Sequence, residues 1–203
     1  MTKESKYNID HPRLIFRETF ADEQSVRRNG GTPTNVTFSK GVGEFNGSSS
    51  FISNTKRIFS KDQFSVLARI RTSIEYVIDS GYVVGEDDGT NRNYVLGVNV
   101  TNEVPRFVTW IGGSAQVATG TTSTNDAEWH IIVGTFGIGG TKVYLDGSLE
   151  GTDATTGVVD DDPGSIAIGA RNGATQWFNG DIDLIEIYNY QLTAEEVANM
   201  AGV

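Results

Sequence analysis

Two turn signals in close succession constrain the fold most, and they lie in the segment WHIIVGTFGIGGTKVYLDGSLEG, residues 129–151. Gly139 and Gly140, followed by Asp146 and Gly147, interrupt runs rich in β-branched and aromatic residues. Gly-Gly and Asp-Gly pairs tolerate the positive φ angles of type I′ and II′ turns, whose twist matches that of the strands they join. The segment therefore predicts two successive β-hairpins.

The same rhythm runs through the chain from Leu14 onward. Short runs of Val, Ile, Phe, Tyr and Thr end at Gly, Asn or Asp within about ten residues, as in antiparallel β-structure. The segment VGEFNGSSSFIS, with Asn46 and Gly47 at the bend, predicts a third hairpin. One helix is predicted near the C-terminus, where Thr193 and Glu196 form a capping box and Gly202 ends the helix.

Length and composition fit one all-β domain. The chain has 203 residues, among them 24 Gly and 4 Pro, which suits many short strands joined by tight turns. Residues 1–12 are polar and unpatterned and are expected to form an N-terminal arm or linker before a domain over residues 13–203.

The charge balance argues against two classes of partner. With 26 acidic and 16 basic side chains the net charge is −10, which repels nucleic acid and anionic membranes. No run approaches the ~20 apolar residues of a membrane helix, and no signal peptide is visible, so membrane insertion is not expected. The chain has no Cys, which leaves its compartment open.

Several motifs resemble the laminin-G-like domain of the concanavalin A-like lectin/glucanase superfamily. They are EWHIIVGTFGIGGTKVYLDGSLEG, the closing segment IAIGARNGATQWFNGDIDLIEIYNYQLTAEEV, and in the first half GVGEFNGSSSFIS and FSVLARIRT, whereas residues 53–125 match more loosely. The resemblance covers roughly residues 14–200 and implies a two-sheet antiparallel jelly-roll sandwich with a short C-terminal helix.

The resemblance also implies a structural calcium ion, because the family often holds one near its first strand. By position its ligands would be Glu18, Gly47 and Asp183. Carboxylates and backbone carbonyls are suitable donors for Ca²⁺. The alternative is that Glu18 and Asp183 are ordinary surface acids or cap loop amides.

Related β-glucanases carry a catalytic trio of acids on one strand, and DIDLIE, residues 181–186, is similar to it. Here Asp181 replaces the first glutamate, and Asp181 and Asp183 share a strand face that Glu186 joins only if a bulge intervenes. The histidines are His11 and His130, and His130 is expected to be packed or hydrogen-bonded in a strand. No catalytic residue is predicted.

A glycan site is predicted around two tryptophans. Trp110 and Trp177 offer ring faces for stacking on sugars, and Arg171, Asn172 and Gln176 offer hydrogen bonds to hydroxyl groups. The alternative is that both tryptophans belong to the core. The polar runs EDDGTNRN, residues 86–93, and DDD, residues 160–162, are interpreted as solvated turns. The alternative for EDDGTNRN is a binding loop, because its carboxylates, amides and Arg92 suit sugar hydroxyl groups or another calcium ion.

Three functions follow from this sequence. The first is a non-catalytic module for glycan or cell-surface recognition, displayed on a larger assembly. The alternative is a phage or viral capsid decoration or fibre protein that contacts other subunits, with homo-oligomerisation open, and the third is a polysaccharide hydrolase or lyase. The expected location is extracellular or the surface of a virion.

Overall fold

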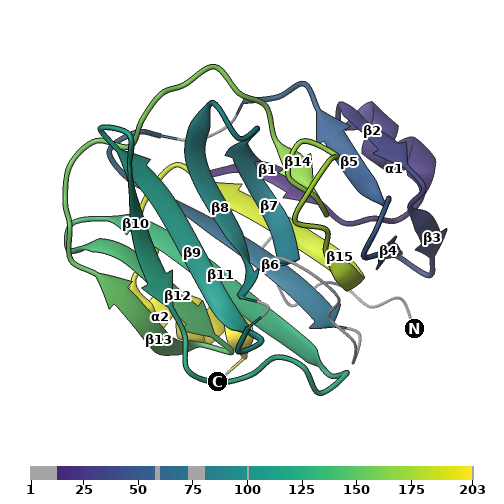
Figure 1. Cartoon of the computed structure of the whole chain (residues 1–203). Helices are drawn as coiled ribbons and strands as arrows, with labels where there is room; N and C mark the ends of the chain where they lie inside the picture. The colour runs from purple at the N-terminus through teal and green to yellow at the C-terminus, as the bar shows by residue number, and fades with distance from the viewer. Residues whose placement is uncertain (1–12, 58–59, 73–80, 100, 203) are drawn as a thin grey trace.

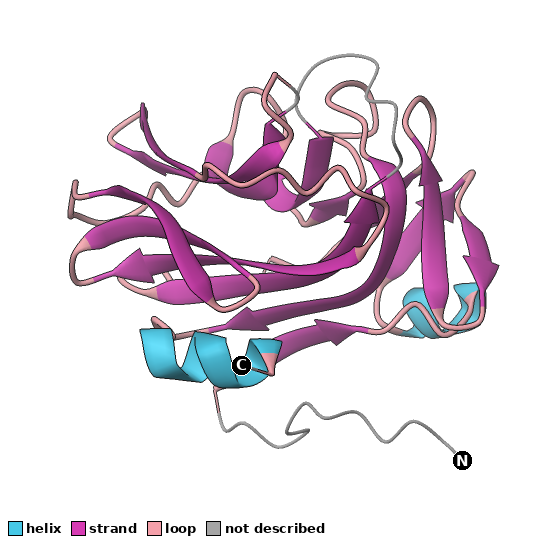
Figure 2. Ribbon diagram, turned by 90° about the horizontal axis from the view of Figure 1, so that it is seen from below, coloured by secondary structure: helices cyan, strands magenta, loops and turns pink. Residues whose placement is uncertain are grey.

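The computed structural model describes residues 13–57, 60–72, 81–99 and 101–202. Within these residues the chain forms two antiparallel sheets that lie face to face as two layers (Figure 1, Figure 2). The prediction of an all-β jelly-roll sandwich with a short C-terminal helix is confirmed. The arm predicted for residues 1–12, with His11, lies outside the described residues.

One layer is an eight-stranded sheet, counted over the described residues. Its order is β13 (Ser148–Asp153), β12 (Gly140–Leu145), β11 (Trp129–Gly137), β6 (Phe64–Thr72), β15 (Asn179–Tyr188), β4 (Val42–Asn46) and β3 (Thr37–Ser39). The eighth strand, β1 (Leu14–Glu18), pairs with the C-terminal part of β15. The N-terminal part of β15 pairs with β4 on the same side.

The other layer is a seven-stranded sheet over the same part of the chain. Its order is β10 (Ser114–Thr119), β9 (Val104–Ile111), β8 (Arg92–Asn99), β7 (Gly81–Asp87), β14 (Ala167–Ile168), β5 (Phe51–Asn54) and β2 (Gly31–Thr34).

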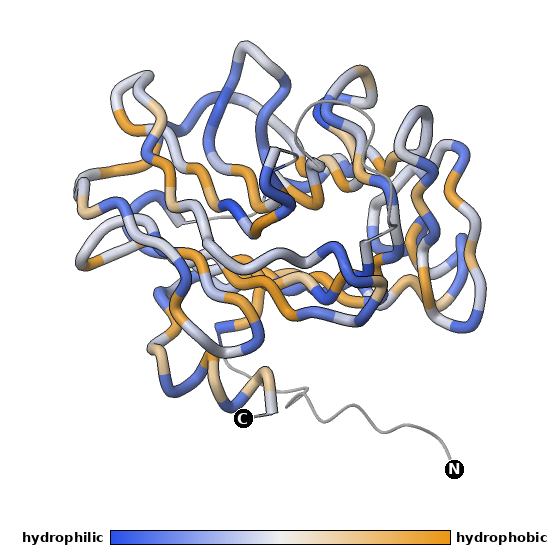
Figure 3. The backbone as a smooth tube through the Cα atoms, turned by 60° about the horizontal axis from the view of Figure 1, so that its bottom comes forward, coloured by the Kyte–Doolittle hydropathy of each residue, from blue (hydrophilic) through white to orange (hydrophobic). Residues whose placement is uncertain are grey.

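The main core lies between the layers. Phe64 of β6 is fully buried, and its ring centroid lies 5.2 Å from that of Tyr94 and 6.0 Å from that of Phe107, both in the opposite sheet. Figure 3 shows hydrophobic positions along the strands of both layers and hydrophilic positions in many connecting loops. Alternating side chains from two sheets thus fill one interior.

Both hairpins predicted in residues 129–151 are confirmed. β11 pairs with β12, and β12 pairs with β13. Asp146 and Gly147 both have positive φ, 45° and 86°, as a type I′ turn requires. In the first hairpin Gly140 already pairs with Gly137, so the turn itself is formed by Ile138 and Gly139.

The third predicted hairpin is wrong, because β4 and β5 belong to different sheets. The turn chemistry is nevertheless present: the side-chain oxygen of Asn46 accepts hydrogen bonds from the backbone N–H groups of Ser48, Ser49 and Ser50. Gly47 adopts a φ of 71°. This Asn-capped turn carries the chain from one layer to the other instead of returning it along the same sheet.

Two helices flank the sheets. The predicted C-terminal helix is α2 (Ala194–Ala201), with the expected reciprocal hydrogen bonds between Thr193 and Glu196 and with Gly202 in the left-handed conformation. It packs on the outer face of the eight-stranded sheet (Figure 2), where Val197 joins a second apolar cluster. The sequence analysis missed α1 (Glu23–Arg28), which Asp22 caps.

We predict that Gly134→Ala destabilises the protein because the two layers touch at this residue. A Cβ at Gly134 of β11 would lie 2.3 Å from Cδ2 of the buried Phe107 ring in the other sheet. Forcing extra atoms into such a contact costs about 1–3 kcal/mol of unfolding free energy. Urea unfolding of the variant beside the wild type measures the loss.

Gly164→Ala is the matched control. Its Cβ would meet nothing closer than 3.9 Å, and a change of less than about 0.5 kcal/mol is expected. Equal unfolding free energies for the two variants would contradict the assigned contact.

Candidate functional site

A hollow lies on the outer face of the seven-stranded sheet, opposite the core. In β9, Phe107 is part of the core and Thr109 bonds Thr141 in the other sheet, so both point inward. The alternation of a strand therefore turns Arg106, Val108 and Trp110 outward. These three side chains form one side of the site.

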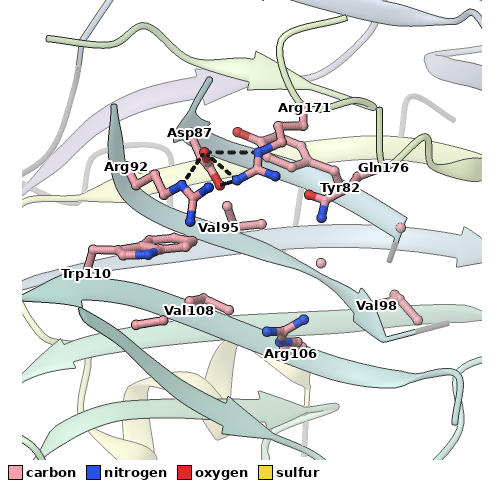
Figure 4. A pocket seen from close by; sticks show the side chains of 13 residues that line it. Tyr82, Asp87, Arg92, Val95, Val98, Arg106, Val108, Trp110, Arg171 and Gln176 are labelled. Carbon is pink, nitrogen blue, oxygen red and sulfur yellow. Dashed lines mark hydrogen bonds and ion pairs between the residues drawn. The ribbon is translucent and has the colours of Figure 1, made fainter. Parts of the chain in front are cut away.

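We call this site the β7–β10 hollow, because β7, β8, β9 and β10 contribute to its lining (Figure 4). Its volume is about 290 Å³, which matches the lower end of the range for small-ligand pockets. Arg171 and Gln176, from the segment between β14 and β15, complete its rim.

Glycines keep part of the floor free of side chains. Gly81 and Gly97 both line the β7–β10 hollow. A Cβ at Gly97 would lie 2.4 Å from the carbonyl oxygen of Gly81, so neighbouring strands can approach here only without that side chain. Val95 and Val108 supply the apolar part of the floor.

A buried carboxylate organises one rim. The Asp87 side chain is 2% exposed. Nε of Arg171 donates to its Oδ1 at 3.0 Å and Nη2 to its Oδ2 at 2.8 Å. Nε of Arg92 lies 3.8 Å from Oδ1 and donates to the carbonyl of Gly89 at 3.0 Å. Both guanidinium groups are thus fixed before any ligand arrives.

Arg106 differs from these two arginines because no described residue neutralises it. Its Nε is buried and makes no hydrogen bond within the described residues, and no ion pair joins it to an acid there. Burial lowers the pKa of its guanidinium from the usual value. The described lining of the hollow therefore contains three arginines and one carboxylate, and only Arg92 and Arg171 lie beside that carboxylate.

The structure gathers three of the five residues predicted for the glycan site. Trp110, Arg171 and Gln176 line the β7–β10 hollow. Asn172 lines a neighbouring hollow with Phe51 and Asp88 instead.

Neither tryptophan is an open platform for stacking. Trp110 is 8% exposed and has the Arg92 guanidinium 5.8 Å from its ring centroid, so it forms a wall of the hollow. Trp177 is half-buried and meets the ring of Phe51 edge-on at 6.1 Å.

Arg106 and Val108 were missed by the sequence analysis. A signal for both exists in VPRFVTWI, where strict alternation places them on the same face as Trp110. Arg92 was considered as a sugar-binding group in the run at residues 86–93, but a solvated turn was favoured; in the structure it lines the hollow from the start of β8.

The residues predicted to bind calcium are not brought together. Glu18 pairs with Ile185, whereas Asn46, the neighbour of Gly47, pairs with Asn179, about 20 Å away along β15 at ~3.4 Å per residue. Asp183 faces Arg69, with 3.2 Å between Oδ2 and Nη1. The Glu18 carboxylate accepts hydrogen bonds from the backbone of Thr19 and Phe20. The three residues do not fit one calcium site, and calcium binding stays a prediction.

A bulge in β15 changes the faces of the acidic trio. The register shifts between Ile182 and Leu184. Ile182, Ile185 and Ile187 consequently point into the core, and Glu186 turns outward with Asp181 and Asp183. The bulge required for a glucanase-like row is therefore present.

Each of these acids nevertheless faces an arginine. Asp181 accepts from Nε of Arg71 at 2.9 Å, and Glu186, fully buried, accepts from Nε of Arg17 at 2.6 Å and from the Tyr188 hydroxyl. Asp183 has Arg69, as described above. Glycosidases need two carboxyl groups that are free to act on the sugar, whereas an arginine holds each acid of this row.

The polar turns have structural roles. Asp88 accepts from the backbone of Thr90 and Asn91, and the bond from Asn91 is the main reason that the pKa of Asp88 is lowered. In DDD, Asp160 caps Gly112 and Gly113. Its two neighbours have other partners: Asp161 pairs with Arg57 and Lys61, and Asp162 accepts from the Arg92 amide.

Comparison with known proteins agrees with this architecture. Residues 45–198 match the family model of the concanavalin A-like lectin/glucanases superfamily. No curated protein sequence matches the chain. Among solved structures, domain 4 of AbnA, a GH43 extracellular arabinanase from Geobacillus stearothermophilus in complex with arabinotriose, is 19% identical with a TM-score of 0.66. The match covers 93% of this chain and 98% of that one.

Two toxin domains share the fold. The binding domain of Paraclostridial Mosquitocidal Protein 1 is 17% identical with a TM-score of 0.70, over 94% of this chain and 52% of that one. The binding domain of botulinum neurotoxin serotype D is 15% identical with a TM-score of 0.63, over 85% of this chain and 46% of that one. The chain thus spans about half of each toxin chain.

None of the helices among the described residues is long and apolar enough to cross a membrane.

We predict that His130 stabilises the fold in its protonated form. Its Nδ1 lies 2.7 Å from Oδ2 of Asp146 and its Nε2 lies 3.0 Å from Oδ1 of Asp126. Burial opposes protonation, but the two carboxylates outweigh it and raise the pKa of His130 above its usual value. This stabilisation is full below the unfolded-state pKa of about 6.5 and is lost as pH rises through the folded-state pKa.

Urea unfolding of the wild type and His130→Gln between pH 5.5 and 8.5 measures this effect. The wild-type advantage in unfolding free energy should be largest at pH 5.5 and should shrink toward pH 8.5. A difference that stays constant over this range would contradict the assigned ion pairs.

Proposed function

Since the chain belongs to the concanavalin A-like lectin/glucanases superfamily, we propose that it is a non-catalytic module that binds a glycan in the β7–β10 hollow. The observation that carries the proposal is the composition of this hollow. It combines an apolar floor and wall with fixed polar groups at its rim. Sugars need both, because they present C–H faces and hydroxyl groups on the same ring.

The apolar contribution comes from Val95, Val108 and the wall formed by Trp110. These side chains favour the C–H face of a sugar ring by removing apolar surface from water. Because Trp110 is only 8% exposed, it contributes an edge of the ring rather than an open stacking face.

The polar contribution comes from Gln176 and the arginines. A primary amide supplies both donors and an acceptor, which suits a sugar hydroxyl group. Gln176 has a positive φ of 56°, an uncommon conformation for a residue with a side chain. The backbone carbonyl of Gln176 accepts a hydrogen bond from the backbone N–H of Tyr82 at 3.0 Å, which fixes the rim to β7. A rim held in this way loses little entropy on binding.

Relatives of the same fold support a binding role. The AbnA domain was solved with arabinotriose, and two further structures are described as binding domains. By analogy we assign this chain to recognition outside the cell, of a glycan or a cell surface. The paired acids of β15 support the non-catalytic part of the proposal.

A role in a virion, as a capsid decoration or fibre protein, stays a prediction, as does homo-oligomerisation. Its motivation was the arm at residues 1–12, which lies outside the described residues. No observation on the described residues favours it over glycan binding.

We predict that Ala115→Ile weakens glycan binding by at least fivefold without changing the thermal midpoint. Ala115 is exposed on β10 and lines the β7–β10 hollow, so a larger apolar side chain there occupies ligand space. A β-branched residue suits a strand, so the fold should tolerate it. A glycan array identifies ligands, and calorimetry on those retained measures affinity.

Ser114→Ile is the matched control because Ser114 is exposed on the same strand but faces the opposite side of the sheet. It should bind as the wild type does. Equal affinity in the wild type and Ala115→Ile would place the glycan elsewhere, and an array with no retained glycan would overturn the proposed function.

A further inference from the structure

We infer that the ligand of the β7–β10 hollow is a glycan carrying a carboxylate, and that Arg106 binds this group. The inference rests on the proposed function and narrows it to a class of sugar. Its basis is the state of Arg106 compared with the other arginines of the described chain.

Most arginines around the hollow and on the sheets have a carboxylate partner. Arg92 and Arg171 share Asp87, and Arg69 and Arg71 face Asp183 and Asp181. Arg106 alone among the arginines lining this hollow has no acid partner among the described residues.

Because of the position of Arg106, the lack of an acid partner among the described residues lowers the stability of the fold. Its side chain is partly withdrawn from water, and its buried Nε makes no hydrogen bond within the described residues. A partly desolvated charge without a counter-ion destabilises a fold, because neither water nor a carboxylate solvates it fully. A ligand anion would satisfy this group.

The charges around the hollow favour one anionic group. The described lining contains three arginines and one carboxylate, so it carries an excess of two positive charges in a chain of net charge −10. The overall negative charge repels polyanions such as nucleic acid, whereas a local positive site still attracts a single anion. The volume of about 290 Å³ fits a small number of sugar units.

The chemistry of the guanidinium group selects a carboxylate. Nε and one Nη of arginine form a planar fork that matches the two oxygens of a carboxylate. Within the described residues, the Nε of this fork has no hydrogen-bond acceptor.

The arrangement of the hollow gives this ligand an orientation. Arg106 and Trp110 lie on the same face of β9, about 13 Å apart at ~3.4 Å per residue. Figure 4 shows Val108 between them and Gln176 across the hollow from Arg106. A carboxylate on Arg106 therefore places the sugar ring over Val108, within reach of the Gln176 amide.

The test compares acids with their neutral esters. An array of oligosaccharides containing galacturonic, glucuronic and N-acetylneuraminic acids, each printed beside its carboxyl methyl ester and with neutral glycans, is probed with the full chain. We expect acids to bind at least tenfold more tightly than their esters, since a charged hydrogen-bonded pair is worth about 1.5–3 kcal/mol. Arg106→Gln should reduce this ratio to about one.

Arg28→Gln is the control, because it removes the same charge from an exposed position on α1. It should keep the wild-type ratio. The thermal midpoint of Arg106→Gln should not fall, since the substitution removes an unneutralised charge. A marked fall would show that Arg106 is required by the fold and would overturn its role as a ligand group.

The outcomes separate this inference from the proposed function. If esters or neutral glycans bind as tightly as the acids, and Ala115→Ile blocks this binding, the inference of a carboxylate ligand is overturned. The proposal of glycan binding in the hollow then still holds. An acid preference that survives Arg106→Gln would overturn the role of Arg106. Absence of any retained glycan would overturn both proposals.

Discussion

Every long strand of this sandwich has one face committed to the shared interior, and the remaining architecture depends on that constraint. Phe64, Tyr94 and Phe107 meet between the layers, and the glycine at position 134 lets β11 approach the Phe107 ring. Since strand side chains alternate, fixing Phe107 inward also fixes Arg106 and Val108 outward. The core therefore positions the β7–β10 hollow, and Val98 belongs to both the core and the lining of the hollow.

Local turn chemistry made part of this fold predictable from the sequence. Asp146 and Gly147 form the expected turn, and Thr193, Glu196 and Gly202 cap α2 as expected. The same reasoning failed at Asn46, whose side chain organises a turn as well as any hairpin would. Whether a turn returns to the same sheet or crosses to the other depends on distant partners, here β15 for β4 and β14 for β5. The residues of the turn do not indicate which distant strands pair with β4 and β5.

The site was predicted only in part for a similar reason. Trp110, Arg171 and Gln176 were selected by residue type, and they do meet. Arg106 could have been found from strand alternation, but its importance comes from the lack of an acid partner among the described residues. Only the arrangement in space shows that Arg92 and Arg171 lie beside Asp87, whereas no described acid pairs with Arg106. The residues that the resemblance implied for calcium lie apart, because the register along β15 places the partners of Glu18 and Asn46 at different ends of that strand.

The two outer faces of the sandwich differ in how their arginines and acids are paired. On the eight-stranded sheet, the bulge at Asp183 places a row of acids on the outer face, and arginines from β6 and β1 face each of them. Arg69 and Arg71 also lie 4.9 and 5.1 Å from the ring centroid of Trp129, so the charges on this face balance one another. On the seven-stranded sheet, the row of Arg106, Val108 and Trp110 has no described acid paired with its arginine. Exposed ion pairs contribute little to stability. The arginine–acid pairs on one face therefore do not imply that the arginines on the other face also have acid partners. What distinguishes the second face is that its uncompensated cation lies in a hollow with an apolar floor, where an anionic ligand gains both from the charge and from exclusion of water.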